Sequence, residues 1–267
     1  MTAQQMLLGA GSEKTGQQQW TDGGTYNWTA PAGVTTIAIL VVGAGGGTTN
    51  PTASGASGGD LRYRNNYTVT AGTTYLVTVG TPGGEAGHTS GNGGAGGSSK
   101  FGTAATPDLI LCASGGRGSN SSNSWDNAAN DSSTIGGDIG GGTGGVGGGF
   151  NGWKGGGGAG GYSGDGGKGS ECNQYSSDQW EPGQGGGGAG GCGNNGGGGV
   201  GLLGEGASGS AYNSEGGSGG ANGQNNKGGD YGGGASEGRD GGRGAVRIIW
   251  PSGAGKRQFP STRTANE

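Results

Sequence analysis

Two acidic residues three positions apart, Asp178 and Glu181 in the segment SSDQWEP, are the pair best placed to do chemistry in this sequence. Paired carboxylates hydrolyse glycosidic bonds, one as an acid and the other as a base or nucleophile. Acids at this spacing in a polar, loop-like segment are more often simply solvated. We therefore expect no catalysis from this pair, and the sequence favours a protein that is not an enzyme.

The other reactive residue types are few and poorly placed. The single histidine, His88, stands in GEAGHTSG without a serine or cysteine nucleophile beside it. The cysteines Cys112, Cys172 and Cys192 lack the spacing of a metal site, so we expect no metal and no other cofactor. Cys172 and Cys192 can pair as a disulfide in an oxidising setting, or all three can remain free thiols. The sequence SGAGKRQ around Lys256 lacks two essential positions of a phosphate-binding loop.

Composition sets this chain apart from ordinary globular proteins. It has 267 residues, of which 80 are glycine and 27% are hydrophobic, whereas glycine is about 7% of average proteins. The net charge is −4 and the basic residues are scattered, which argues against a nucleic-acid partner. No apolar run approaches the roughly 18 residues of a membrane span, and MTAQQMLLGAG does not resemble a signal peptide. We expect synthesis in a cytoplasm and no membrane insertion.

The apolar residues are concentrated in short segments that are rich in β-branched and aromatic residues and bounded by turn residues, which predicts β-strands. These segments are TYNWTAP (25–31), TTIAILVV (35–42), DLRYR (60–64), YTVTAG (67–72), TYLVTVG (74–80), SSKF (98–101), DLILCASG (108–115) and GAVRIIW (244–250). DLRYR and YTVTAG form either a hairpin or one bulged strand. Because an isolated strand is unstable, 244–250 must pair with the N-terminal strands. The sequence predicts a mainly β fold, an antiparallel β-sandwich, with little or no α-helix.

This pattern divides the chain into four regions. Residues 1–24 are a candidate N-terminal attachment segment, and residues 25–114, completed by 244–250, form the sandwich. Residues 115–243 are a glycine-rich insertion whose two ends the sandwich holds together. Residues 251–267 form a C-terminal tail.

The glycine tracts of the insertion, such as GGGGAGGCGNNGGGG (185–199), are either a disordered linker or an ordered array. An extended helix with three residues per turn rises about 3.1 Å per residue and has no internal hydrogen bonds. Its backbone groups must therefore bond to neighbouring tracts, and only glycine lets the backbones approach closely. A strict Gly-X-Y repeat is missing, which excludes collagen. We expect an inserted layer of polyglycine-II-type helices, antiparallel where turns reverse the chain, with Thr143 and Val146 on outward rows.

Glycine-poor segments between the tracts become loops if the tracts are ordered. They carry aromatic and amide side chains: Trp125, Asn127, Trp153, Tyr175, Trp180, Tyr212 and Tyr231. Rigid rings beside Ser, Asn and Gly are typical of antibody paratopes, and rings with amides also suit carbohydrate. These residues are our candidate receptor-binding loops. The alternative is that the rings only seal the glycine layer.

Both ends of the chain resemble tailed-bacteriophage virion proteins. WTAPAGVTTIAILVVGAGGG (28–47) resembles the first strands of their glycine-rich modules, and GGRGAVRIIWPSGAGKRQFPST (241–262) resembles the ending of such proteins, especially in marine and cyanobacterial phages. The resemblance implies a jelly-roll, TNF-like sandwich carrying polyglycine helices, as in the glycine-rich extracellular domains of certain animal receptor kinases. Adhesins at the tips of some phage long tail fibres similarly display loops on polyglycine layers.

The resemblance implies a non-enzymatic protein of the virion tail apparatus that binds a host-surface receptor. Its expected partners are a host cell-surface glycan or outer-membrane protein, other virion tail proteins, and further copies of itself, with a homotrimer favoured. The alternative is a purely structural fibre or decoration protein whose glycine layer packs subunits. That role places the aromatic rings between subunits, whereas an adhesin exposes them.

Overall fold

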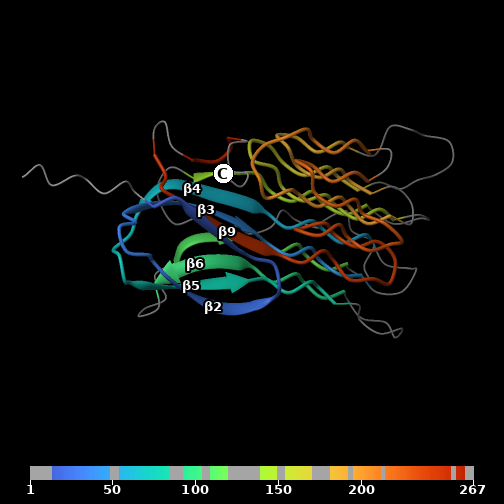
Figure 1. Cartoon of the computed structure of the whole chain (residues 1–267). Coiled ribbons are helices and arrows are strands. Elements are labelled where there is room, and N and C mark those ends of the chain that lie inside the picture. The colour runs from blue at the N-terminus through green and yellow to red at the C-terminus, as the bar shows by residue number, and fades with distance from the viewer. Residues whose placement is uncertain are drawn as a thin grey trace, which may run out of the picture.

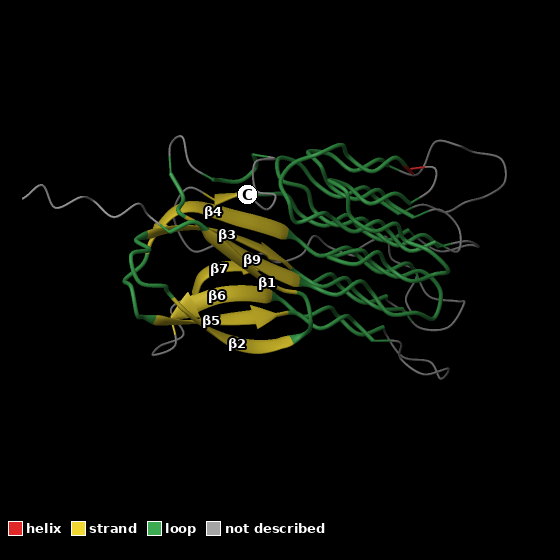
Figure 2. Cartoon of the chain, viewed as in Figure 1, coloured by secondary structure: helices red, strands yellow, loops and turns green. Residues whose placement is uncertain are grey.

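The computed structural model describes residues 14–48, 54–84, 93–103, 109–119, 139–148, 154–169, 181–191, 195–211, 214–253 and 257–261. Figure 1 shows two parts that lie end to end: β-strands at one end, and narrow, wavy chain segments that extend from the strands at the other. Figure 2 shows that these wavy segments are neither strand nor helix. We call each of them a tract and the whole array the glycine layer.

The strands form the expected antiparallel β-sandwich. One sheet has the order β1-β9-β3-β4-β8 and the other β2-β5-β6-β7. The described strands are β1 (Gly16–Trp20), β2 (Gly24–Thr29), β3 (Thr36–Val42), β4 (Leu61–Thr68), β5 (Thr74–Val79), β6 (Ser99–Thr103), β7 (Leu109–Ala113), β8 (Ile139–Gly140) and β9 (Ala245–Trp250). The C-terminal strand β9 lies between β1 and β3, as its isolation in the sequence predicted.

The main hydrophobic core lies between the two sheets and is organised around Trp28. The Trp28 ring lies 5.8 Å from Tyr75, 6.2 Å from Phe101 and 5.8 Å from Trp250, measured between ring centroids. Trp250 ends β9, so the last strand contributes a large part of this core. Burial of such rings is the main apolar stabilisation available to a chain with few hydrophobic residues.

A second hydrophobic cluster covers the opposite face of the five-stranded sheet. Leu40 and Ile249 on that face pack with Tyr162 and Leu202 from the glycine layer and with Phe259 from the C-terminal segment. Strands β3 and β9 are therefore covered on both faces. This explains why TIAILVV is a continuous apolar run and why every residue of AVRIIW, including Arg247, is buried.

The sheet begins earlier in the chain than the sequence analysis predicted. Residues Gly16–Trp20 pair with β9, and Gln18 lies opposite Ile248, so the predicted attachment segment 1–24 includes one strand and the start of β2. GQQQW lacks the β-branched residues that mark a strand, but Trp20 packs against the main core. Pairing to a strongly apolar neighbour outweighs the low strand propensity of glutamine.

The segments DLRYR and YTVTAG form one bulged strand, β4, and not a hairpin. The register of β4 against β3 shifts between the pairs Ile37–Tyr67 and Ile39–Arg64. The extra residue lies at Asn65–Asn66, and Asn66 has a φ of 55°. Asparagine tolerates this left-handed conformation better than most residues, which is consistent with a bulge here.

Hydrogen bonds in the glycine layer repeat every three residues. Along residues 43–48, three successive N–H groups donate to three different tracts, and the fourth returns to the first tract. The bonds run from Gly43 to Asp60, Ala44 to Gly97, Gly45 to Gly242, Gly46 to Ser57, Gly47 to Gly94 and Thr48 to Arg239, with N···O distances of 2.8–3.0 Å. One turn later along residues 43–48, each neighbouring tract supplies as acceptor a residue three positions earlier in the sequence. All three neighbours are therefore antiparallel to residues 43–48. This is the geometry of a three-residue-per-turn helix.

Residues 55–61 follow the same rule, with three antiparallel neighbours. Parallel neighbours occur as well: the N–H groups of Gly157 and Gly160 donate to Ala56 and Gly59, respectively. The layer therefore combines both directions, whereas the sequence analysis considered only antiparallel packing.

Close backbone packing is why the tracts contain glycine. A Cβ added to Gly46 would lie 2.5 Å from the carbonyl carbon of Arg117, and one added to Gly58 would lie 2.5 Å from that of Gly158. Ordinary carbon contacts begin near 3.4 Å. Dense packing, and not flexibility, therefore accounts for glycine at these buried positions.

The glycine layer contains more of the chain than the predicted insertion 115–243. Residues 43–48, 54–60, 80–84 and 93–97 also belong to it, because they bond with the insertion or with each other. Strands and tracts are both extended, so β3 passes directly into a tract at residue 43. The predicted boundary at residue 115 separated two parts of one array.

Candidate functional site

The two ends of the glycine layer differ in what they contact. At the near end, next to the sheets, turns insert Tyr162 and Leu202 into the second hydrophobic cluster. At the far end, neighbouring tracts are joined by bonds such as Gly148 N–H to Gly155 O (2.8 Å) and Gly156 N–H to Asn195 O (3.2 Å). Figure 1 shows this end on the side of the layer away from the strands.

Most predicted loop residues belong to chain segments that begin and end at the far end. Trp153 lies in 149–153, Tyr175 and Trp180 lie in 170–180, and Tyr212 lies in 212–213; the residues that flank each segment are at the far end. Trp125 and Asn127 lie in 120–138, which leaves the far end at Ser119. These six residues, and also Cys172 and Cys192, lie outside the described residues.

Tyr231 is the exception, because the structure places it at the near end. Its carbonyl accepts a bond from the Val200 N–H (3.0 Å), and its half-buried ring packs against the second hydrophobic cluster. Burial raises the pKa of Tyr231, and Asp230 adds to this increase. Tyr231 is thus separated from the other candidates and fits the alternative role of sealing the layer.

The turn at residues 225–226 lies at the far end and is described in full. Gln224 and Lys227 exchange two backbone hydrogen bonds, of 3.1 and 2.9 Å. Asn225 and Asn226 between them have φ values of 49° and 68°. Two successive residues with positive φ are typical of a type I′ turn, which Asn favours. This turn is a tight connection between antiparallel tracts.

Side chains cap many amides on the outer tracts, where no neighbouring tract can accept them. These bonds are Thr143 to Asp165 (2.7 Å), Gly186 to Ser208 (3.0 Å), Gly206 to Ser218 (3.1 Å), Ser210 to Glu215 (3.3 Å) and Gly216 to Asn222 (3.0 Å). The polar residues of the tracts therefore close the edges of the array, as charged and polar residues do at the edges of β-sheets.

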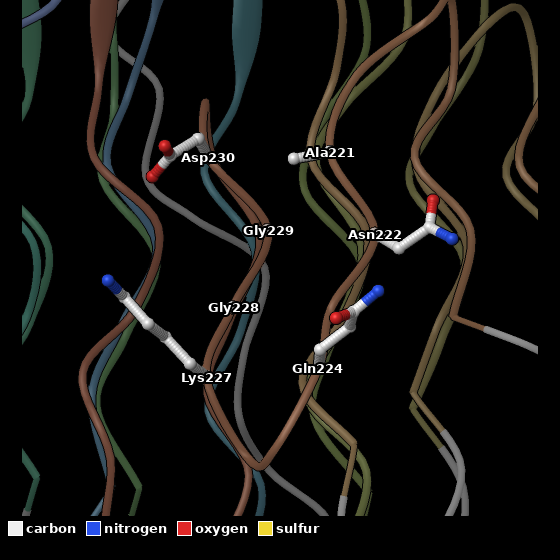
Figure 3. Close-up of a pocket in the computed structure, with 7 residues that line it drawn as sticks. All are labelled: Ala221, Asn222, Gln224, Lys227, Gly228, Gly229 and Asp230. Carbon is white, nitrogen blue, oxygen red and sulfur yellow. The ribbon is translucent and has the colours of Figure 1, made fainter.

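A groove of about 180 Å³ lies beside the described turn, between tract 221–224 and tract 227–230. Figure 3 shows its lining: small residues Ala221, Gly228 and Gly229 on the walls, with the longer polar side chains of the two tracts around them. The sequence analysis missed this groove. The only signal was the polar run GQNNKGGD, which reads equally well as an ordinary turn.

A family model described as "Glycine-rich domain" matches residues 21–251, which is most of the chain. The chain belongs to this family. No match was found among curated proteins.

Buried charges hold the glycine layer to the sandwich. Asp60, which is fully buried, accepts a bond from the Gly144 N–H (2.9 Å) and forms an ion pair with Arg62 at 3.6 Å. Arg62 also donates to the carbonyls of Leu61 and Gly142. These contacts join the start of β4 to a tract of the layer, where strand and tract meet.

A second polar cluster joins Gln17, near the start of the described chain, to Arg247 and Arg257 near its end. Arg247 on β9 is 1% exposed and donates to Leu202 O (3.1 Å) and Gln17 Oε1 (2.8 Å). Arg257 donates to the same Gln17 oxygen (2.5 Å). Burial lowers the pKa of Arg247, and the nearby positive charge of Arg257 adds to this. Part of the predicted C-terminal tail is thus packed: Phe259 is buried and bonds through its backbone to Asn65.

Tyr162 anchors the near end of the glycine layer to the second hydrophobic cluster. Its hydroxyl donates to Gly201 O (2.9 Å) and accepts from Gly204 N–H (3.1 Å). Burial raises the pKa of this phenol well above its usual range. Its ring lies 6.1 Å from Tyr63 and 6.0 Å from Phe259.

The described part of the glycine-rich domain has no group of three or more His, Cys, Asp or Glu side chains placed to hold a metal ion. Cys112 is buried in β7 as a free thiol, and burial raises its pKa. No described helix is long and apolar enough to cross a membrane.

Proposed function

We propose that this glycine-rich domain protein is a bacteriophage virion protein of the tail apparatus and acts as a non-enzymatic adhesin. Its receptor-binding surface would be the far end of the glycine layer. There, Trp125, Asn127, Trp153, Tyr175, Trp180 and Tyr212 would contact a host-surface glycan or outer-membrane protein. The assignment to a phage tail rests on the resemblance of residues 28–47 and 241–262 to virion proteins.

One observation carries the choice of surface. The described residues that flank 149–153, 170–180 and 212–213 all lie at the same end of a densely bonded layer. A fixed layer that attaches several aromatic and amide-rich segments at one end resembles an antibody framework with its loops. Several copies on one virion would strengthen weak individual contacts through avidity.

The binding role can be tested with purified full chain on candidate host cells and their isolated surface glycans. The triple variant Trp153→Ala, Tyr175→Ala, Trp180→Ala should lose most binding, because aromatic anchors dominate interface energies. The control variant Thr25→Ala, Asn27→Ala changes exposed residues of β2, in the sandwich, and should bind normally. Equal binding by both variants would contradict the proposed surface.

The location in the virion needs a separate measurement. An antibody against residues 119–134 should label the tails of purified particles and block adsorption to the host. An antibody against residues 66–74, which include the turn between β4 and β5 at the end of the sandwich away from the layer, should leave adsorption unchanged. Tail labelling by the first antibody without any effect on adsorption would favour the structural alternative.

A further inference from the structure

The open edge of the five-stranded sheet points to a contact between two copies of this chain. We propose that strand β1 of one copy pairs antiparallel with β1 of a second copy about a two-fold axis, so that the sheet continues from one molecule into the next. The axis passes between the two Gln18 residues, and Gln17 of each copy lies opposite Gln19 of the other. The inference does not depend on the proposed adhesin function.

Strand β1 lacks the features that usually protect the edge of a sheet. It is the first strand in the order β1-β9-β3-β4-β8 and pairs on one side only, with β9. Natural edge strands are commonly very short, bulged, or interrupted by charged residues or proline. The sequence of β1, GQQQW, has no charge and no proline, and its register with β9 is unbroken. At the opposite edge of this sheet, β8 has only two residues.

The alternation of backbone groups shows which residues of β1 face outward. In an antiparallel sheet, successive residues direct their N–H and C=O groups to opposite sides of the strand. The Leu61 N–H on β4 donates to Gly142 O, on the side away from β3. Following this alternation through the registers of β4, β3 and β9 makes Gln18 bond to β9 and leaves Gln17 and Gln19 facing outward. Within the described chain, the N–H groups of Gln17 and Gln19 donate to no acceptor.

The composition of β1 suits a second copy of itself as the partner. When the two strands run antiparallel about Gln18, Gln17 of each copy exchanges both N–H···O bonds with Gln19 of the other. A glutamine amide both donates and accepts hydrogen bonds, so identical glutamines can pair across a two-fold axis, whereas identical charges would repel. The side chains of Gln18 and Gln19 are exposed. The strand is therefore self-complementary, as an isologous interface requires.

Open space lies next to β1 in the described structure. A cavity of about 390 Å³ is lined by Gln17, Gln18, Gln19, Arg247 and Leu203. Among the described residues, Leu203 is the one large apolar side chain that is mainly exposed, at 51%. A strand paired with β1 would lie beside this cavity and cover part of Leu203, which adds apolar burial to the backbone bonds.

Sedimentation velocity of the full chain over about 1–300 μM tests this inference directly. The wild-type chain should show a concentration-dependent monomer–dimer equilibrium. Gln18→Lys and Gln18→Glu should each weaken the dimer by about tenfold or more, because each places like charges opposite one another at the axis. An equimolar mixture of the two variants should form heterodimers, since the introduced lysine then faces the introduced glutamate.

A proline in β1 tests the backbone bonds separately from the side chains. Proline is tolerated in an edge strand where the lost N–H faces solvent, so Gln19→Pro should fold normally and weaken the dimer by about tenfold or more. Gln19→Thr keeps this N–H and should still dimerise.

The matched control is Asn27→Lys, which introduces a charge at an exposed amide residue of β2, the edge strand of the other sheet. This variant should leave the dimer intact. A wild-type chain that remains monomeric throughout this range, or that forms only trimers, would overturn the inference. So would an oligomer that Gln18→Lys and Gln19→Pro leave unchanged, since another surface would then hold it together.

Discussion

Replacing Gly46 with alanine tests whether the glycine layer is as tightly packed as described. The new Cβ would start 2.5 Å from the Arg117 carbonyl carbon and 3.0 Å from the Gly118 nitrogen. Moving the carbonyl carbon to an ordinary contact of 3.4 Å requires the tract that contains Arg117 to move by about 0.9 Å. The Arg117 carbonyl oxygen lies closer still and requires a larger shift. The bonds of 2.8–3.0 Å that hold the tract beside Arg117 include Ser57 to Arg117, Gly116 to Ala44 and Gly96 to Gly116.

A shift of this size takes two or three of these bonds beyond hydrogen-bonding distance, at a net cost of about 1 kcal/mol each. Alanine also restricts the unfolded chain, which returns about 0.4–1 kcal/mol. We therefore expect Gly46→Ala to lower the free energy of unfolding by about 2 kcal/mol. For a domain of this size, the expected decrease in Tm is about 4–8 °C.

The measurement is thermal and urea unfolding, followed by tryptophan fluorescence because Trp28 and Trp250 are buried in the sandwich. The matched control is Gly84→Ala, also in the glycine layer, where an added Cβ meets nothing within 4 Å. This variant should be neutral or slightly stabilised. If Gly46→Ala were as stable as Gly84→Ala, the dense packing of the layer would be refuted.

Three further predictions concern the contacts between the layer and the sandwich. Tyr162→Phe removes the bonds to Gly201 and Gly204 and should cost about 1–3 kcal/mol by urea unfolding, because it leaves a buried carbonyl and N–H unpaired. Ionisation of Tyr162 should leave the free energy of unfolding unchanged below pH ~10 and lower it above pH ~10, because the phenol ionises there in the unfolded chain while burial keeps it neutral in the folded chain. The variant Tyr162→Phe should therefore lose less stability at alkaline pH than the wild type. Equal loss in both proteins would contradict this prediction. Asp60→Asn should lower the free energy of unfolding by about 3 kcal/mol or more, because the buried Arg62 cation then lacks its carboxylate partner. A decrease below about 1 kcal/mol would contradict the role of this ion pair.

Much of the sandwich could be predicted because its strands carry strong local signals. The run TIAILVV and the isolated strand AVRIIW identified the two central strands, and pairing of the second with the first followed from the instability of single strands. Strand β1 could not be found this way, because GQQQW is defined by its neighbour β9 and not by its own composition. Sequence patterns report local preference, whereas edge strands depend on the partner.

The three-residue geometry of the glycine tracts could also be predicted, since backbone groups without internal bonds must find external partners. What the sequence could not provide is which tract lies beside which. Glycine has no side chain to specify a neighbour, so the bond from Gly45 to Gly242 looks like any other pair of glycines. The groove beside Ala221 was missed for the same reason, and Tyr231 was grouped with the loops because aromatic composition does not distinguish the two ends of a tract.

The three-residue repeat also restricts how the length of a tract can change, because the direction of each N–H depends on its position within the repeat. Inserting three residues into tract 43–48 would lengthen it by one turn and leave every later amide facing the same neighbour. Inserting one or two residues would rotate the remainder of the tract by a third or two-thirds of a turn and direct each N–H of the series Gly43 to Thr48 at the wrong partner. Related proteins should therefore tolerate arbitrary length changes in the far-end connections, but changes within the tracts only in multiples of three. Related proteins with a wider glycine layer should have gained tracts in pairs. Each tract crosses the layer once, so two added tracts return the chain to the end of the layer from which it started.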